Sequence, residues 1–256
     1  MTEPEQQRRD TDGALVPLLL ALTVVTGFVD AVSILRLGHV FVANMTGNVV
    51  FLGFALAGAP GFSITASLTA MAAFATGALA GGRLGARHRA HRGKLHSSAA
   101  AVQAAFLAAS VILAVAGGAA PPAGYRYSLI AVLGIAMGIQ NATARTIAVP
   151  DLTTTVLTLT ITGIAADSAL AGGSGSKAGR RLLSVATMLA GAVVGAVLIR
   201  HAEGWCPLLI ALVVIAAGAA ATYWLGKSDP AWVRTRLPEV SYPIGGSRWP
   251  LTELTT

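Results

Sequence analysis

Cysteine and charge are both scarce in this sequence. It has one cysteine, Cys206, in 256 residues, and Asp, Glu, Lys and Arg make up only 11% of the chain. A single cysteine excludes an internal disulfide framework. Hydrophobic residues, at 54%, exceed what one soluble core of this size would bury, so the surplus must face lipid. The two shortages together favour a plasma (inner) membrane of the bacterial type.

Long polar stretches are also missing. Eight apolar runs cover residues 15–34, 39–58, 61–82, 97–118, 127–149, 152–171, 182–199 and 205–226. Most reach the roughly 20 residues that a helix needs to cross about 30 Å of hydrocarbon. None alternates apolar and polar residues in the manner of membrane barrel strands. The sequence therefore predicts an all-α, polytopic membrane bundle, with one transmembrane domain, 14–226, between an N-terminal tail, 1–13, and a C-terminal tail, 227–256.

The basic residues are expected to set the topology. The formal net charge is +7, but Lys and Arg fall in short loops between the apolar runs and form no basic domain. Nucleic acid is therefore not an expected partner, whereas the lipid bilayer is. The first apolar run has no small-x-small cleavage site before Asp30, so it is expected to remain as an uncleaved first helix.

The number of crossings follows from the positive-inside rule. Eight crossings with the N-terminus inside would divide the 18 Lys and Arg residues ten to eight. If 39–58 and 152–171 each return to the side they came from, the division becomes fifteen to three, with only Arg36, Arg126 and Arg200 outside. The second division has the expected bias. It predicts six net crossings, cytoplasmic termini and two segments that are either re-entrant hairpins or half-helices.

Those two segments are also the most polar of the eight. The first holds His39, Asn44, Thr46 and Asn48, and the second holds Thr153, Thr154, Thr155, Thr158, Thr160, Thr162 and Asp167. Polar or irregular backbone at membrane depth is tolerated only where protein or a watery cavity covers it. The polarity therefore agrees with the charge division.

The two halves, about 14–118 and 127–226, show three correspondences in the same order. Gly27-Phe28-Val29-Asp30-Ala31 returns as Gly138-Ile139-Gln140-Asn141-Ala142 about 111 residues later, Asn44-Met45-Thr46 returns as Thr153-Thr154-Thr155 about 109 later, and Gly77 with Gly81 returns as Gly191 with Gly195 about 114 later. Three net crossings per half would give an inverted repeat, in which solute sites form near the bilayer midplane. Apolar helices also resemble one another by composition alone. The glycine pairs suit packing within one chain or within a homo-oligomer.

Asp30 is the sharpest single candidate for a functional residue. A carboxylate inside an apolar helix is costly and usually faces protein or a cavity. Asp30 is near the helix end, however, so it could instead lie at the interface or form a buried structural hydrogen bond or ion pair. Gln140 and Asn141 stand at the matching place in the second half, and Arg145 lies one helical turn beyond Asn141. A pairing of Asp30 with Arg145 is one hypothesis for this group.

The amides of the first polar segment form a second candidate group. Asn44 and Asn48 are four positions apart, so both lie on one helical face with Thr46 at its edge. They could coordinate a polar solute or ion, or they could hold helices together. Thr155 and Thr158 could line the facing surface, but such hydroxyls often bond to their own backbone.

Three other motifs do not support a site. The loop Gly172–Lys177 lacks the Gly-Lys-Ser/Thr order of a phosphate loop. His88, His91 and His96 have arginines around them and no cysteine or carboxylate, so no metal is expected. No Ser/His/Asp set falls at membrane depth, and no other cofactor is indicated.

The strings Gly27-x-x-Asp30-Ala31, Phe41-Val42-Ala43-Asn44-Met45-Thr46-Gly47-Asn48 and Gly138-x-Gln140-Asn141-Ala142 resemble the YoaK family of bacterial membrane proteins, domain of unknown function 1275. The resemblance covers about 14–226. It implies a small polytopic inner-membrane protein and no particular activity. One departure is that Thr155 is followed by Val156, where a Thr-Gly pair would echo Thr46-Gly47.

The leading hypothesis for function is a small-solute transporter or channel. Its site would be lined by Asp30, Asn44, Thr46, Asn48, Gln140, Asn141 and Arg145, and its partner would be a small polar solute or ion. One alternative is a membrane-embedded enzyme acting on a lipid or isoprenoid. Another is a non-transporting scaffold or assembly factor.

Overall fold

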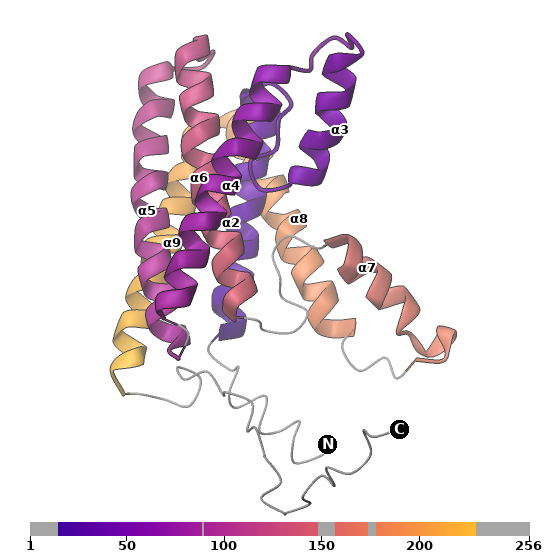
Figure 1. Cartoon of the computed structure of the whole chain (residues 1–256), viewed down its shortest axis with the longest axis vertical. Helices are drawn as coiled ribbons and strands as arrows, with labels where there is room; N and C mark the ends of the chain where they lie inside the picture. The colour runs from indigo at the N-terminus through magenta and orange to yellow at the C-terminus, as the bar shows by residue number, and fades with distance from the viewer. Residues whose placement is uncertain (1–14, 89, 148–156, 174–177, 229–256) are drawn as a thin grey trace, which may run out of the picture.

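The computed structural model describes residues 15–88, 90–147, 157–173 and 178–228. These ranges contain eight α-helices and no β-strand (Figure 1). The helices are α2 (Leu15–Arg36), α3 (Met45–Leu56), α4 (Ile64–Arg87), α5 (Arg92–Gly117), α6 (Ala123–Ile147), α7 (Leu157–Ala166), α8 (Ala178–His201) and α9 (Cys206–Leu225), with short 3₁₀ turns at Ala169–Ala171 and Gly226–Ser228.

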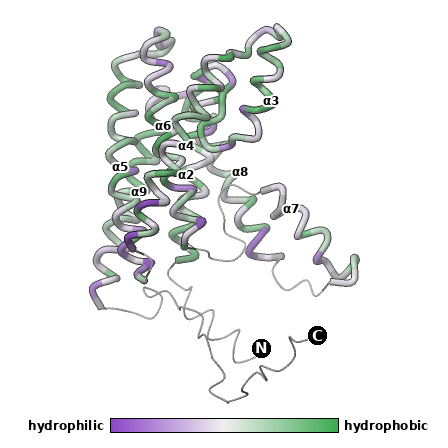
Figure 2. Tube along the Cα trace, viewed as in Figure 1, coloured by the Kyte–Doolittle hydropathy of each residue, from purple (hydrophilic) through white to green (hydrophobic). Residues whose placement is uncertain are grey.

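Six of these helices are long and apolar enough to cross a membrane, namely α2, α4, α5, α6, α8 and α9. The other two, α3 with 12 residues and α7 with 10, are too short, because at about 1.5 Å per residue they span only about 18 and 15 Å. The predicted fold class, an all-α membrane bundle with six helices of spanning length and two shorter segments, is confirmed. Apolar residues extend along most of the bundle, and the more polar residues gather toward one end (Figure 2).

The first short segment bends back along the bundle after α2. His39 has a positive φ of 54°, which an Asn, Asp or His side chain tolerates better than a branched one, and the chain turns there. Val40, Val42 and Ala43 are buried, so this extended stretch is covered by protein. Helix α3 then packs against α4 (Figure 1). The irregular backbone is therefore shielded from lipid, as membrane depth requires.

The second short segment differs in what surrounds it. Helix α7 packs against α8, and Asp167 just beyond it forms an ion pair with Arg181, with 2.6 Å between Oδ2 and the guanidinium. Thr153, Thr154 and Thr155, which the sequence placed in this segment, lie outside the described residues.

Two glycine-lined crossings hold the bundle together. Helix α4 packs against α6 and α8 packs against α2, while α5 and α9 pack against each other and against α6 and α2 respectively. Gly77 lies against the backbone of Ile135, and Gly191 lies against the backbone of Val24. Both contacts leave no room for a Cβ, which is the reason for small residues at these positions. The glycine pairs therefore pack within the monomer.

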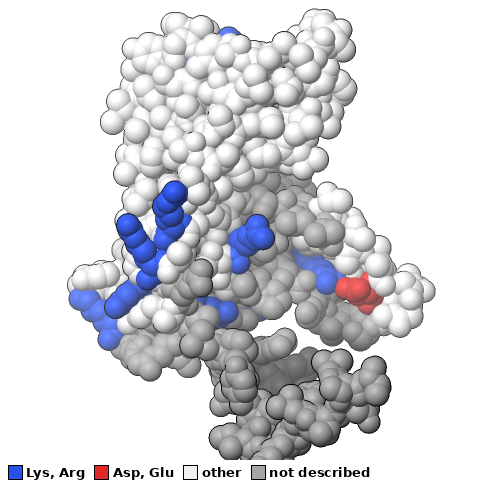
Figure 3. Space-filling model, viewed as in Figure 1, with Lys and Arg blue, Asp and Glu red and all other residues white. Residues whose placement is uncertain are grey.

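Charge is divided unequally between the two ends of the bundle (Figure 3). The helix ends near Arg36, Arg126 and Arg200 share one end. The other described basic residues belong to the opposite end, namely Arg83, Arg87, Arg92, Lys94, Arg145, Arg180, Arg181 and Lys227.

Candidate functional site

A pocket of about 590 Å³ lies where the bend before α3 meets α4 and α6. Its lining residues are Ala43, Asn44, Met45, Thr46, Phe74, Ala78, Gly82, Asn141, Ala142, Ala144, Arg145 and Thr146. Four of the residues singled out from the sequence, Asn44, Thr46, Asn141 and Arg145, are therefore brought together here. They come from positions about a hundred residues apart in the chain.

The bend before α3 supplies the first two of these side chains. Asn44 is the N-cap residue of α3 and has extended backbone angles, φ −119° and ψ 93°, but its side chain makes no capping hydrogen bond. Its amide is exposed and faces the pocket with the hydroxyl of Thr46. Because α3 begins at this point, the backbone N–H groups of its first turn give this wall a partial positive charge.

The end of α6 supplies the opposite wall. The Asn141 Nδ2 donates to the Met137 carbonyl oxygen at 2.8 Å, and the Thr146 hydroxyl donates to the Ala142 carbonyl oxygen at 2.9 Å. Arg145 is exposed in the last turn of α6, where a cation complements the helix dipole. It is the one charged side chain among the described lining residues. The pocket therefore offers hydrogen bonds and positive charge.

Asn48, also singled out from the sequence, lies outside this pocket and is fully buried. The Phe41 N–H donates to Asn48 Oδ1 at 2.9 Å, and Asn48 Nδ2 donates to the Phe41 carbonyl oxygen at 2.5 Å. This paired bond fastens the extended stretch to the first turn of α3. Asn48 therefore shapes the wall that carries Asn44.

Asp30 lies behind the same wall. It is 7% exposed, and the Ala43 backbone N–H acts on its carboxyl group as a hydrogen-bond donor. Its Oδ1 has no hydrogen-bond partner among the described residues. The hypothesised ion pair with Arg145 is not formed in the described structure, because burial and the Ala43 backbone are the influences on the Asp30 carboxyl group there, with no contribution from Arg145.

Gln140 lies in a different place, at the centre of a buried polar cluster. Its Oε1 accepts a hydrogen bond of 2.6 Å from Gln103 Nε2, and its Nε2 donates to Thr26 Oγ1 at 2.9 Å and to the Leu22 carbonyl oxygen at 3.3 Å. The amide thus joins α2, α5 and α6. Its observed hydrogen bonds join helices, and Gln140 is not among the described lining residues of the pocket.

His96 belongs to the same cluster, and the sequence reasoning missed this role. It is 2% exposed, and a cavity of about 10 Å³ lies between it and Gln103, Gln140 and Thr143. A volume of this size holds about one water molecule. The available signal was the spacing of His96 and Gln103, which are seven positions apart and therefore on one helical face.

Of the two threonine candidates in the second polar segment, Thr158 is not among the described lining residues of the pocket. Thr158 is exposed on α7, which packs against α8. Thr155 lies outside the described residues. Within the described ranges, no group of three or more His, Cys, Asp and Glu side chains could hold a metal ion.

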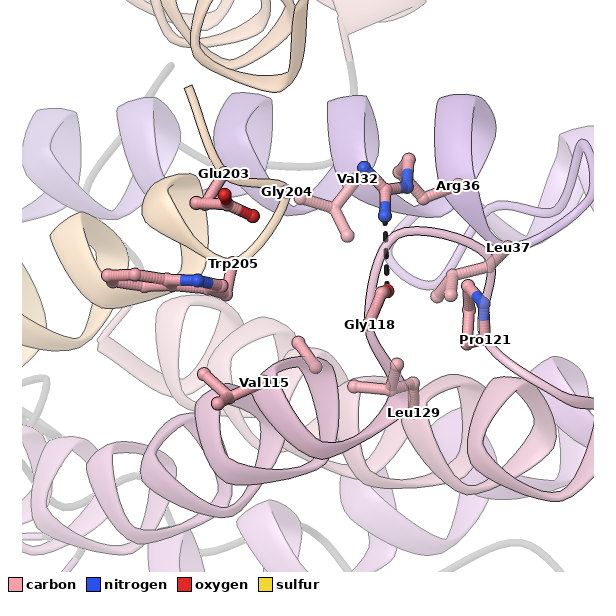
Figure 4. Close-up of a pocket in the computed structure, with 11 residues that line it drawn as sticks. Val32, Arg36, Leu37, Val115, Gly118, Pro121, Leu129, Glu203, Gly204 and Trp205 are labelled. Atoms are coloured by element: carbon pink, nitrogen blue, oxygen red, sulfur yellow. Dashed lines mark hydrogen bonds between the residues drawn. The ribbon is translucent and has the colours of Figure 1, made fainter.

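A smaller pocket of about 80 Å³ lies at the opposite end of the bundle (Figure 4). Arg36 lines it and donates to the carbonyl oxygens of Gly118, at 3.3 Å, and Ala119. Its guanidinium also lies against Gly204, beside Glu203 in the loop between α8 and α9. Arg36 thus fastens two loops together at this end.

Comparison with known proteins identifies a family of unknown function and a transmembrane relative. The family model described as "Protein of unknown function (DUF1275)" matches residues 18–221. The UPF0700 transmembrane protein YoaK of Bacillus subtilis (strain 168) is 33% identical over 151 residues, which is 59% of this chain and 65% of the relative. The match therefore covers slightly less than two thirds of that protein. No solved structure matches.

Proposed function

We propose that this chain, which belongs to the DUF1275 family of proteins of unknown function, is a small-solute transporter. It is a multi-pass membrane protein. The observation that carries the proposal is the pocket in which the bend before α3 meets the end of α6. Discontinuous helices that begin at membrane depth form solute sites in many transporters.

The proposed solute is small and anionic. Arg145 and the first turn of α3 supply positive charge, Asn44, Thr46 and Asn141 supply hydrogen-bonding groups, and no carboxylate is among the described lining residues. Phe74 and Met45 add apolar surface for a short carbon chain. A cation would meet no compensating charge in the described lining.

Equivalent helix contacts support an inverted repeat. The three nearest atoms that a Cβ on Gly138 would meet are the Phe74 carbonyl oxygen, the Ala78 nitrogen and the Gly77 carbonyl carbon. The three that a Cβ on Gly27 would meet are the Met188 carbonyl oxygen, the Ala192 nitrogen and the Gly191 carbonyl carbon. The two sets correspond residue by residue. Positions in α6 are 111 residues after their counterparts in α2, and positions in α8 are 114 residues after their counterparts in α4.

The same offsets relate a second pair of contacts. Gly81 lies against Ile139 and Ala142, and Gly195 lies against Phe28 and Ala31. Similarity of composition alone would not match individual contacts in this way. An inverted repeat in turn supports transport, because two halves of opposite orientation can open a shared site to each side in turn.

The charge division supports an orientation. The end that carries Arg83, Arg87 and Arg145 has most of the described basic residues. The positive-inside rule places that end in the cytoplasm, together with both termini. The anion pocket would then lie on the cytoplasmic side of the bend before α3.

Flux into liposomes tests the proposal. The purified protein would be reconstituted and offered the anions inorganic phosphate, lactate and succinate, with glycine and glucose, which have no net charge, as the comparisons. We expect at least one anion to enter faster than into protein-free vesicles. Arg145→Gln should lower that flux about tenfold, the effect of losing one charge-assisted hydrogen bond of about 1.5 kcal/mol. Arg83→Gln is the matched control, because Arg83 is exposed near the same end but does not line the pocket.

A non-transporting scaffold is the second candidate. The bonds of Asn48 to Phe41 support it, because both polar groups of this predicted site amide are bonded to backbone atoms. The two candidates differ in one result. If no probe enters the liposomes and none of a broad panel of metabolites raises the melting temperature, transport is rejected and the scaffold is preferred.

A further inference from the structure

Asp30 is a buried acid in a membrane-spanning helix. It lies in the second half of α2 and is 7% exposed, between Val29 and Ala31, which are also buried. A carboxylate at such a position loses its hydration and needs a compensating cation or several hydrogen-bond donors.

The described surroundings offer Asp30 very little. The Ala43 N–H is the one donor that acts on the carboxyl group, and Oδ1 has no partner among the described residues. Arg36, the nearest cation along α2, is instead bonded to the carbonyl oxygens of Gly118 and Ala119. An ionised carboxylate would therefore be left with an uncompensated buried charge.

The elements packed against α2 do not supply a cation to Asp30 within the described ranges. Their charged and titratable side chains lie toward the helix ends or in the polar cluster around Gln140. These side chains are Arg180, Arg181, Arg200 and His201 on α8, Cys206 and Tyr223 on α9, Tyr125, Arg126, Tyr127 and Arg145 on α6, His96 on α5, and His39 in the bend before α3. None of them acts electrostatically on the Asp30 carboxyl group.

We propose that Asp30 is a proton-binding site, and that it carries a proton in the conformation described here. A proton adds to Oδ1 to give a neutral carboxylic acid, and it returns to water when the acid ionises. The new O–H can donate to a carbonyl oxygen of its own helix, as the hydroxyls of Thr23 and Thr26 do to Leu19 and Leu22 at 3.0 and 2.9 Å. A metal cation fits less well, because it needs several oxygen ligands and the one backbone group facing the carboxyl is a donor.

The position of Asp30 gives the proton a role beyond neutralising a charge. Its partner Ala43 is the first residue of the wall that carries Asn44 and Thr46 into the pocket. Ionisation would strengthen the bond from the Ala43 N–H, because charge-assisted hydrogen bonds are shorter and stronger than neutral ones. Proton occupancy would therefore shift the wall of the anion pocket, and this coupling, unlike the protonation, rests on the proposed function.

Infrared spectroscopy of the full-length protein in lipid tests the protonation directly, without any transport. An un-ionised carboxylic acid has a C=O stretching band that a carboxylate lacks. At pH 7 we expect the spectrum to contain such a band, to lose it in Asp30→Asn, and to keep it in Asp167→Asn. Asp167 is the matched control because its side chain is 59% exposed and paired with Arg181. A spectrum that is identical in the unsubstituted protein and Asp30→Asn would overturn the proposal.

Two further measurements complete the test. If Asp30→Asn does not fold, the unsubstituted protein labelled with ¹³C at its six aspartate carboxyl groups is titrated instead, and one carboxyl group that stays protonated at pH 7 supports the proposal. Full ionisation of all six at pH 7 overturns it. Sodium that raises the melting temperature and removes the acid band would overturn it in favour of a metal cation site. Absence of solute flux would reject the transporter but leave these results unchanged.

Discussion

The imidazole of His96 is hydrogen-bonded to the hydroxyl of Thr222, with 2.9 Å between Nδ1 and Oγ1. The direction of this bond is fixed by a neighbour. Thr222 has one O–H, and it donates to the Gly218 carbonyl oxygen. The Thr222 oxygen must therefore accept from His96, so Nδ1 carries the proton.

The tautomer of His96 is accordingly the first prediction. Its Nε2 lies in the buried cluster without a partner among the described residues, so a proton on Nε2 would leave a buried N–H unsatisfied. We expect ¹⁵N spectra of histidine-labelled protein to show one neutral imidazole in the Nδ1–H form, and Thr222→Val to remove that signature. A neutral His96 in the Nε2–H form would contradict this assignment.

The second prediction concerns the Gln140 cluster. Gln140→Leu would leave Gln103 Nε2 without its acceptor and Thr26 Oγ1 without its donor, so it should reduce the free energy of unfolding by about 1–3 kcal/mol. Denaturant unfolding in detergent gives the measurement. The double variant with Gln103→Leu is the control, because it removes both members of one bond. Its loss should be smaller than the sum of the two single losses, and strict additivity would mean that the two amides do not interact.

Sequence alone predicted the frame of this molecule well because the bilayer constrains it strongly. Length, apolar composition and the charge division led to six crossing helices and two short segments, and the structure has six helices of spanning length with α3 and α7 as the shorter ones. The charge division was decisive, since the apolar runs alone would have counted 39–58 as a crossing. Insertion physics therefore determined most of the fold.

The candidate site was harder to predict because polarity alone does not reveal its use. Asn44 and Asn48 look alike in the sequence, yet one faces the pocket and the other is bonded to Phe41. Likewise Gln140 and Asn141 are neighbours in the chain, but Gln140 faces the buried polar cluster and Asn141 faces the pocket. These differences depend on the direction of the chain after Gly38 and His39 and on how α6 is rotated, which no single-sequence pattern specifies.

The contrast between the two asparagines gives the third prediction. Asn48→Ala removes both bonds to Phe41 and should lower the free energy of unfolding by about 1–3 kcal/mol, because it leaves the part-buried N–H and C=O groups of Phe41 unpaired. Asn44→Ala removes an exposed side chain that makes no capping bond, so its cost should stay below about 0.5 kcal/mol. The melting temperatures of the two variants should therefore differ, with the lower value for Asn48→Ala. Equal losses would mean that Asn44 is also structural and would weaken the case for the pocket.

The fourth prediction uses the glycine crossings. A Cβ on Gly27 would lie 2.6 Å from the Ala192 nitrogen and the Met188 carbonyl oxygen, a separation that backbone atoms can relieve only by moving α8. Gly27→Ala should therefore destabilise the protein by about 1–3 kcal/mol. Gly53→Ala in α3 is the matched control, since nothing lies within 4 Å of its Cβ position, and it should be neutral or stabilise by up to about 1 kcal/mol. Gly138→Ala extends the test to the other half, where the corresponding contacts with α4 should make its cost similar to that of Gly27→Ala. If Gly138→Ala were as harmless as Gly53→Ala, the two crossings would not be equivalent, and the argument from matched contacts for an inverted repeat would fail.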